Sequence, residues 1–466
     1  MPRLQQVTRA KLKRVTLTAV LLAGPACAVN RLPPTGTTAG TTADTSQVPG
    51  PTTSQPTTSQ PTASQPTASQ PKAIDDGLKL MFATARRRNI DPNADGTDVP
   101  AMVVGANQFA IDVYRNVGAA NHGNVVVGPY SIVTALGLIY AGAAGTTADE
   151  MAKVLHTGMP ADPWHRALNA YDLSLDARTA GSPTKWAVAN KVWVQQGLTL
   201  LPSFLDRLVS DYGAPVAEAD FATDAEKERA TINRWVERST NDLIPELFPT
   251  GSIDSSTALA LVNAVALDAP WEFPFDPRNT SNGEFQRGDG SAVMVPMMRY
   301  DEFLPSGSGD GYQTVEIPYG GGALSMVIIV PQNLAAFEAK LDAKRFAVVI
   351  GGISEGGIHL SMPRWSSRTH SNLNDILSAL GMPSAFGAAD FSGMTGARLA
   401  LSTVEHEAFI EVDEKGTRAA AATGGAMVAS HGATVSVDRP FLYVVRDRGS
   451  GIVLFIGRVT DPSAGP

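Results

Sequence analysis

The sequence predicts an α+β fold, in which helices and strands pack around a common core. Two nearly continuous apolar runs, Ala323–Val330 and Gly451–Val459, are typical of strands that are covered on both faces. By contrast, Val99–Val117 has the apolar period of an amphipathic helix, and Trp186–Val194 again indicates a strand. Both element types therefore recur along one chain.

Length and composition indicate how large the core can be. The chain has 466 residues, of which 43% are hydrophobic, enough for one large domain or two ordinary ones. Its only cysteine is Cys27, so an internal disulfide is excluded.

The N-terminus has the pattern of an export signal. Basic residues precede the apolar run Val15–Ala23, which is about half as long as a membrane-spanning helix. We therefore expect residues 1–28 to be a signal peptide and the protein to be exported. Cys27 stands where a bacterial lipoprotein signal places the cysteine that receives lipid, although Gly24 replaces the usual leucine. A cell-surface lipoprotein is favoured, and a plain secreted protein is the alternative.

Residues 29–72 are predicted to be a linker. From Pro51 the chain repeats Pro-Thr-Thr-Ser-Gln and then Pro-Thr-Ala-Ser-Gln, with no side chain large enough to pack in a core. Proline extends such a chain, so it could hold a domain some tens of ångströms from a membrane. The folded domain is expected over residues 73–466.

The net charge argues against a nucleic-acid partner. Removing the signal takes five Lys and Arg residues and no acid from a formal charge of −8, which leaves −13. An acidic domain of this kind repels a phosphate backbone.

A tract of small residues near the C-terminus is the most informative segment for function. The residues from Ala408 to Asp413 alternate apolar with polar like a half-buried strand, and four alanines follow between glycines. Asp438–Val445 then begins another apolar strand. We therefore expect a long exposed loop between two strands.

The tract is also suited to becoming a strand itself. Counted in twos from Thr417, one face carries only small uncharged residues, and Arg418 falls on the opposite face. The segment could therefore enter a closed sheet without burying a charge. A buried charge without a partner would cost several kcal/mol.

This pattern resembles the hinge of the serpins, a family of serine protease inhibitors. The resemblance covers roughly residues 100 to 462 and is carried by four motifs in the family's order, namely Asn124–Ile132 with Thr134–Met151, Leu261–Pro277, Leu401–Ile410 and Asp438–Phe441. It implies a serpin-like fold, with a large mixed sheet surrounded by helices, further sheets and an exposed reactive loop near the C-terminus. The implied partner is a serine protease, and the protein is expected to be a monomer.

The resemblance implies a suicide mechanism and assigns residues to it. The protease cuts the bait bond, forms an acyl-enzyme, and is trapped covalently when the freed loop inserts into the main sheet. The bond is placed between Ser430 and His431, with Ala429-Ser430 or Val428-Ala429 as alternatives. The implied hinge consists of Glu414, Gly416, Thr417, Arg418, Ala419, Ala420, Ala421, Ala422 and Thr423.

Four further residues are placed by resemblance where the sheet must open. These are Ser131, Asn263, Trp271 and His406, and we expect them to gate loop entry rather than to catalyse. Small residues around the bait bond favour a protease with a shallow primary pocket, of the elastase or subtilisin type. Arg418 departs from the glutamate common at its hinge position, so insertion is expected to be slower than usual.

The sequence leaves two other functions open. A non-inhibitory serpin-fold binding protein is the main rival. A serine hydrolase is the third possibility, because Gly352–Gly356 fits the nucleophile-elbow pattern, yet the strand expected over Gly357–Pro363 stands where that motif needs a helix. No cluster has metal-ligand spacing and no glycine-rich loop precedes a helix, so neither a metal nor a cofactor is expected.

Overall fold

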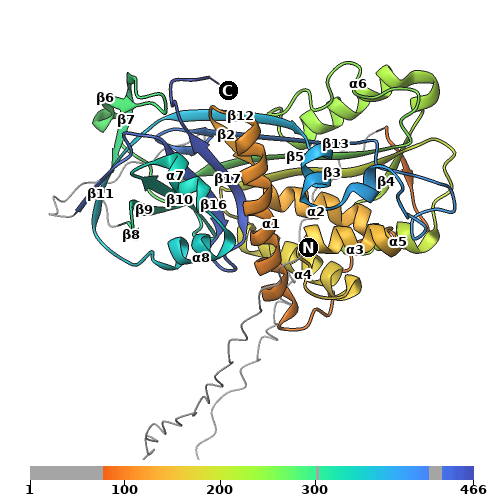
Figure 1. The fold of residues 1–466 in the computed structure, drawn as a ribbon. Helices are drawn as coiled ribbons and strands as arrows, with labels where there is room; N and C mark the ends of the chain where they lie inside the picture. Colours follow the sequence, from red (N-terminus) through yellow and green to blue (C-terminus); the bar gives the residue numbers. More distant parts are fainter. Residues whose placement is uncertain (1–76, 301–303, 419–432, 466) are drawn as a thin grey trace, which may run out of the picture. The chain divides into compact units, whose positions relative to one another are not determined.

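The computed structural model describes residues 77–300, 304–418 and 433–465, with α-helices and three sheets (Figure 1). The chain divides into two units, Met1–Pro66 and Thr67–Pro466, and every described residue belongs to the second. The predictions for Cys27, for the signal and for most of the linker concern residues outside the described ranges.

The largest sheet has the strand order β1-β4-β3-β5-β14-β13-β12. Its strands are β1 (Lys79–Met81), β3 (Lys185–Gln195), β4 (Val216–Ala219), β5 (Leu259–Pro270), β12 (Trp365–Asn372), β13 (Thr403–Val412) and β14 (Gly416–Thr417). β5 and β13 run parallel and pair directly from Ala260 opposite Thr403 to Ala266 opposite Phe409. Beyond that point β14 lies between them, antiparallel to both.

The other two sheets contain the remaining strands. One has the order β2-β17-β16-β10-β9-β8 and the other β15-β11-β7-β6. Their bounds are β2 (Val125–Val127), β6 (Ser281–Gln286), β7 (Ala292–Tyr300), β8 (Ser306–Gly309), β9 (Tyr312–Pro318), β10 (Leu324–Pro331), β11 (Ile358–Pro363), β15 (Ala433–Ser436), β16 (Phe441–Asp447) and β17 (Val453–Val459). The predicted apolar strands at 323–330 and 451–459 are therefore present as β10 and β17.

Helices cover both faces of the large sheet. The helices of the described residues are α1 (Asp98–Ala120), α2 (Pro129–Tyr140), α3 (Gly145–Val154), α4 (Ala161–Thr179), α5 (Pro202–Tyr212), α6 (Phe221–Ser239), α7 (Leu334–Ala339), α8 (Ala343–Gly351) and α9 (Asn374–Leu380), with 3-10 turns at Pro277–Asn279 and Pro383–Phe386. α1 confirms the helix predicted over 99–117. α2 begins with proline at its first turn, where no intrahelical N–H is needed.

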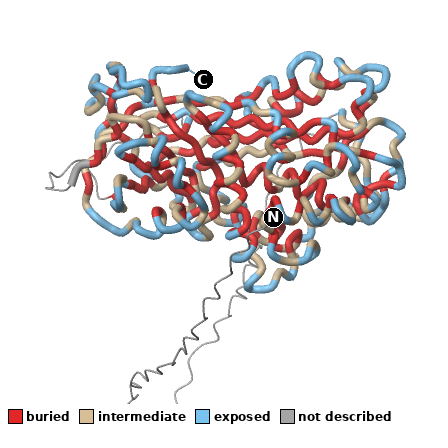
Figure 2. Tube along the Cα trace, in the orientation of Figure 1, coloured by how far each residue is buried: buried red, intermediate tan, exposed pale blue. Residues whose placement is uncertain are grey.

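The large sheet separates two apolar clusters. Side chains of α1, α2 and α4 pack on one face with Leu261, Val265 and Leu267 of β5, and α6 packs on the other face with Val262 and Ala266. Successive side chains of a strand point to opposite faces, so β5 contributes to both clusters and is buried along almost its whole length (Figure 2). This explains its nearly continuous apolar sequence.

Two parts of the expected loop are strands in the structure. Gly416–Thr417 forms β14, and Ala433–Ser436 forms β15, which pairs in parallel with β11. The strand expected from Asp438 begins only at Phe441, because Pro440 cannot donate a backbone hydrogen bond to a ladder. The residues between the two short strands lie outside the described ranges.

Candidate functional site: a sheet opening that holds the hinge

Gly416 and Thr417 lie in the opening between β5 and β13. Thr417 stands opposite Ala269 of β5 and opposite Val412 of β13, and its side chain is fully buried. A Cβ atom at Gly416 would lie only 2.2 Å from the carbonyl oxygen of Ala269. Glycine is therefore required where the chain turns into the sheet.

Two aromatic rings form the floor under the hinge. The Tyr319 hydroxyl lies 2.5 Å from Thr417 Oγ1, and its ring stacks on Trp271 with centroids 4.7 Å apart. Trp271 Nε1 donates to the carbonyl oxygen of Asp413 at 2.9 Å. Trp271, which the resemblance placed where the sheet must open, therefore contacts the chain just before the predicted hinge, whereas Tyr319 was not anticipated.

Glu414 anchors the start of the hinge. Its side chain is almost fully buried and accepts hydrogen bonds from Arg364 Nε at 2.8 Å and Thr280 Oγ1 at 2.6 Å. Burial raises the pKa of the Glu414 carboxyl, but the bonds from Arg364 and Thr280 outweigh burial and leave the pKa below its ordinary value. An ionised carboxylate at this position fixes the chain just before it enters the sheet.

A second polar cluster joins β5 to β13 further along the sheet. Asn190, Asn263 and His406 lie opposite one another on β3, β5 and β13. Asn263 Nδ2 donates to Ser131 Oγ of α2 and to Asn190 Oδ1, both at 2.6 Å. The structure thus brings Ser131, Asn263 and His406 together, as the resemblance implied.

His406 connects β13 to β5 in this cluster through its bond to Asn263. The Gly128 N–H donates to His406 Nε2 at 3.2 Å, so the neutral ring carries its proton on Nδ1 and donates it to Asn263 Oδ1. A strand inserted between β5 and β13 must break this bond. Burial, aided by the positive potential of His370, lowers the pKa of His406 to about 3.

Sequence reasoning missed Asn190, Tyr319 and Arg364. Asn190 had a readable signal, because it interrupts the apolar side of the strand Trp186–Val194 that packs on α2. Tyr319 and Arg364 had no such signal in the sequence, because they contact residues that are 50 or more positions away.

The nucleophile-elbow pattern has no catalytic context. Ser354 follows α8 and precedes β11, the reverse of the strand, turn and helix that the motif requires. Its backbone pairs with Ser306 across an isolated bridge.

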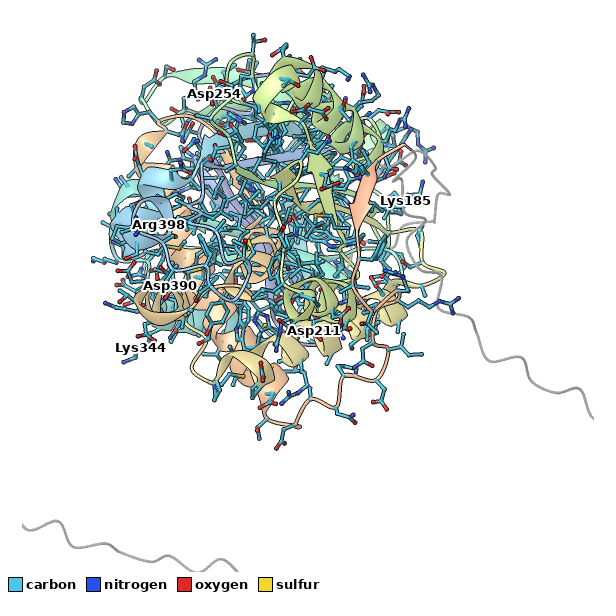
Figure 3. The ribbon with its side chains drawn as sticks, turned by 90° about the vertical axis from the view of Figure 1, so that its right-hand side faces the viewer. Lys185, Asp211, Asp254, Lys344, Asp390 and Arg398 are labelled. Atoms are coloured by element: carbon cyan, nitrogen blue, oxygen red, sulfur yellow. The ribbon has the colours of Figure 1, made fainter. Side chains whose placement is uncertain are left out.

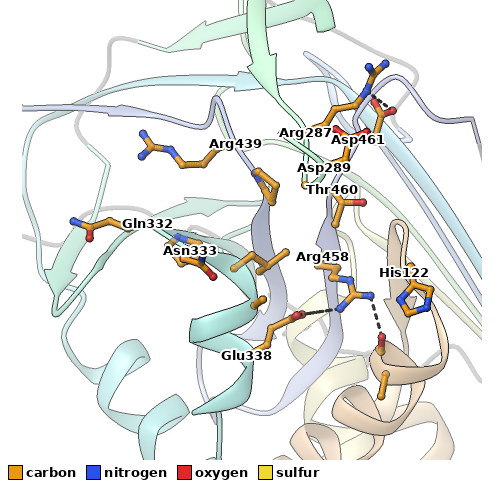
Figure 4. A pocket seen from close by; sticks show the side chains of 17 residues that line it. His122, Arg287, Asp289, Gln332, Asn333, Glu338, Arg439, Arg458, Thr460 and Asp461 are labelled. Carbon is orange, nitrogen blue, oxygen red and sulfur yellow. Dashed lines mark hydrogen bonds and ion pairs between the residues drawn. The ribbon is translucent and has the colours of Figure 1, made fainter. Parts of the chain in front are cut away.

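A cavity of the described residues lies elsewhere, between the end of α1, α7 and β17 (Figure 4). Its volume is about 760 Å³. Arg458 donates to Glu338 and to the backbone carbonyl oxygens of Gly118, Asn121 and Gly123. Arg287 is paired with Asp461. These cations already have partners, so we assign the cavity no ligand. In the described ranges, no group of His, Cys, Asp and Glu has a geometry for metal, and no helix is long and apolar enough to cross a membrane.

Comparison with known proteins identifies the family. The model of the family described as "Serpin (serine protease inhibitor)" matches residues 104–462, and the chain belongs to this family. Mouse leukocyte elastase inhibitor A is 32% identical over 374 residues, which cover 76% of this chain and 97% of that relative. An uncharacterized serpin-like protein of Thermococcus kodakarensis is 33% identical over 394 residues, covering 82% and 91%.

Solved structures agree with this assignment. Native tengpin, a thermophilic serpin, has a TM-score of 0.72 and 25% identity, covering 84% of this chain and 99% of that one. Protease nexin-1, solved with heparin, has a TM-score of 0.71 and 26% identity, covering 78% and 100%. The predicted serpin fold is confirmed. Because serpins are protease inhibitors rather than enzymes, the chain is not a hydrolase.

The buried histidines predict a loss of stability in acid. Burial lowers the pKa of both His165 and His406 from about 6.5 to about 3. Below pH 6.5 the unfolded chain binds protons that the folded state does not, so each group lowers the free energy of unfolding by about 1.4 kcal/mol per pH unit down to its folded pKa. Urea unfolding at pH 7 and pH 5 should show the fall. Hydrogen bonding to Glu405 raises the pKa of His370, so that group acts in the opposite sense.

The matched variant is His406→Gln, which keeps a hydrogen-bonding side chain without a titrating ring. We expect the free energy of unfolding of this variant to fall less steeply between pH 6.5 and pH 4. The difference in slope should be about 1.4 kcal/mol per pH unit, because unfolding takes up one proton fewer. An unchanged slope in this variant would show that His406 is not held neutral.

Proposed function

We propose that this protein inhibits a serine protease by offering its loop as bait and inserting the cut loop between β5 and β13. The observation that carries the proposal is β14, because Gly416 and Thr417 already occupy the place of the first inserted residues. Insertion would exchange the pairs between β5 and β13 for two new ladders, and distortion of the protease's active site would then trap the acyl-enzyme.

The order of steps follows from the contacts around the hinge. Before cleavage the chain is fixed at both ends, by Glu414 on one side and by β15 on the other. Cleavage releases the segment that follows Thr417 from β15. It can then continue the ladder that β14 starts, provided that the bond between Asn263 and His406 opens.

We place the bait bond between Ser430 and His431, with Ala429-Ser430 and Val428-Ala429 as neighbouring registers; all of these residues, and Ala419 to Thr423 of the hinge, lie outside the described ranges. The small residue Ser430 suits a protease of the elastase or subtilisin type. The relatives named as leukocyte elastase inhibitors support this target class.

For location, we propose an exported protein whose domain, residues 73–466, is carried on a linker over residues 29–72. Lipid on Cys27, with the signal cut immediately before that cysteine, would leave the inhibitor at the cell surface, whereas removal of all of residues 1–28 would leave it secreted. The basic residues that precede the apolar run Val15–Ala23 support this proposal.

The direct test mixes the purified domain with equal molar amounts of an elastase-type and a subtilisin-type protease. A denaturing gel should show a band at the summed mass with at least one of them, and mass spectrometry should locate the cut. Cleavage by both enzymes without such a band would favour the non-inhibitory binding protein.

Changing the bait residue should change the target. Ser430→Arg should create inhibition of a trypsin-type protease, because an acidic primary pocket selects arginine before the cut bond. The expected gain is at least about tenfold in the rate of complex formation, given that charge pairing in such a pocket exceeds 1.4 kcal/mol. Ala429→Arg is the matched variant. If it gains trypsin inhibition and Ser430→Arg does not, the register is wrong by one residue.

A further inference from the structure

Charged side chains stand on the large sheet on both sides of the hinge. Lys185 of β3 stands opposite Asp268 of β5, with Nζ 3.9 Å from Oδ2, and Lys185 reaches the surface (Figure 3). On the other side of the opening, Glu411 of β13 is exposed and stands opposite Ser366 of β12. We call Lys185, Asp268 and Glu411 the charged row.

All members of the charged row lie on the face of the sheet that α6 covers. On β5, Ala264 and Ala266 pack in the cluster of α6, so Asp268, two residues further, points the same way. On β13, Phe409 belongs to that cluster, and Glu411 follows at the same spacing. The two carboxylates therefore flank the opening from the same side.

The register of the hinge determines which residue fits between them. Gly416 is opposite Pro270 and Thr417 is opposite Ala269, so the next residue of an extended β14 stands opposite Asp268. On β13, Thr417 is opposite Val412, so the same next residue stands opposite Glu411. That residue is Arg418, whose side chain lies on the opposite face from Thr417.

We propose that Arg418 is a positioning residue, which completes the charged row between Asp268 and Glu411 and thereby starts and aligns loop insertion. The proposal rests on the proposed function, since it assumes that the cut loop inserts. It reverses the expectation that arginine at this place slows insertion. Opposite charges directly across a strand pair stabilise a sheet, and like charges destabilise it; a glutamate here would face two carboxylates.

Arg418 already contacts β13 through its backbone and its side chain. Its N–H donates to the Glu411 carbonyl oxygen at 2.9 Å, and its guanidinium carbon lies 6.0 Å from the centre of the Phe409 ring. Its backbone φ of 40° keeps it from continuing the strand. For a residue with a Cβ atom, this left-handed conformation is unfavourable, so extension into the opening would relieve it. Burial raises the pKa of Asp268, and the charges of Lys185 and Arg418 oppose that rise.

The test compares Arg418→Glu and Arg418→Gln with the unchanged protein, by the fraction that forms covalent complex with an inhibited protease. At low salt, about 0.02 M, we expect Arg418→Glu to form complex about tenfold less efficiently, and Arg418→Gln to lie between the two. At about 0.5 M salt the difference should shrink, because exposed charges are screened. Adding Glu411→Arg to Arg418→Glu should restore complex formation.

The control variant Arg115→Glu makes the same change of charge on an exposed position of α1 and should behave as the unchanged protein. Equal complex formation by Arg418→Glu and the unchanged protein at low salt would overturn the proposal, as would a loss that Glu411→Arg does not restore. The melting temperature of the cleaved form separates the two ideas. If cleavage stabilises the unchanged protein while Arg418→Glu behaves like it, only the charged row is wrong; if cleavage stabilises nothing, the proposed function fails first.

Discussion

Cleavage of the loop should raise the melting temperature of this protein by about 10 °C. A dozen residues entering between β5 and β13 gain backbone hydrogen bonds on both sides, each worth about 1 kcal/mol net, against an ordering cost of similar size per residue. Side-chain burial adds to the balance, and a net gain on the order of 10 kcal/mol shifts the melting temperature by about 1 °C per kcal/mol in a domain of this size.

The measurement is thermal unfolding followed by circular dichroism, before and after a single cut near Ser430. An inserting protein should melt much later after the cut. A cleaved form that melts within a few degrees of the intact one would show that β14 does not extend. That result would favour the non-inhibitory binding protein.

Thr417→Arg should convert the inhibitor into a substrate. Thr417 is fully buried and its hydroxyl contacts Tyr319, so a guanidinium in its place would be buried without a counter-charge at a cost of several kcal/mol. The intact protein can avoid this cost by leaving the hinge outside the sheet, but the cut loop cannot insert without paying it. We expect the covalent complex to fall by at least about tenfold, which corresponds to 1.4 kcal/mol.

The control for this variant is Thr417→Val, which removes the hydroxyl and keeps the size and the neutral charge. It should still form complex. If Thr417→Arg also forms stable complex, or if its cleaved form gains the full thermal stability, Thr417 is not the first inserted residue.

The helices and strands of the fold could be predicted from the sequence because they depend on local patterns. The periodicities over Ala323–Val330 and Val99–Val117 follow from burial on two faces or one, and the tract Ala419–Thr423 has only small side chains. The glycine before the tract is explained by the close approach of the Ala269 carbonyl.

The partners of the hinge could not be predicted, because they are determined by tertiary contacts. Arg364 and Thr280 reach Glu414 from distant positions. The backbone of Tyr319, which follows the end of β9, meets Trp271 only through an isolated bridge. The role that we propose for Arg418 likewise depends on strand register. Its neighbours Asp268 and Glu411 are far apart in sequence and are set opposite it only by β14.

The central claim is that the cut loop becomes a strand between β5 and β13, and amide hydrogen exchange of the cleaved protein tests it most directly. The account predicts that the peptide from Ala419 to Val428 exchanges as slowly as β5 does, because each of its amides would then be bonded within a sheet. If that peptide exchanges fully within seconds while β5 and β13 remain protected, the two strands have stayed paired with each other and the loop has not inserted.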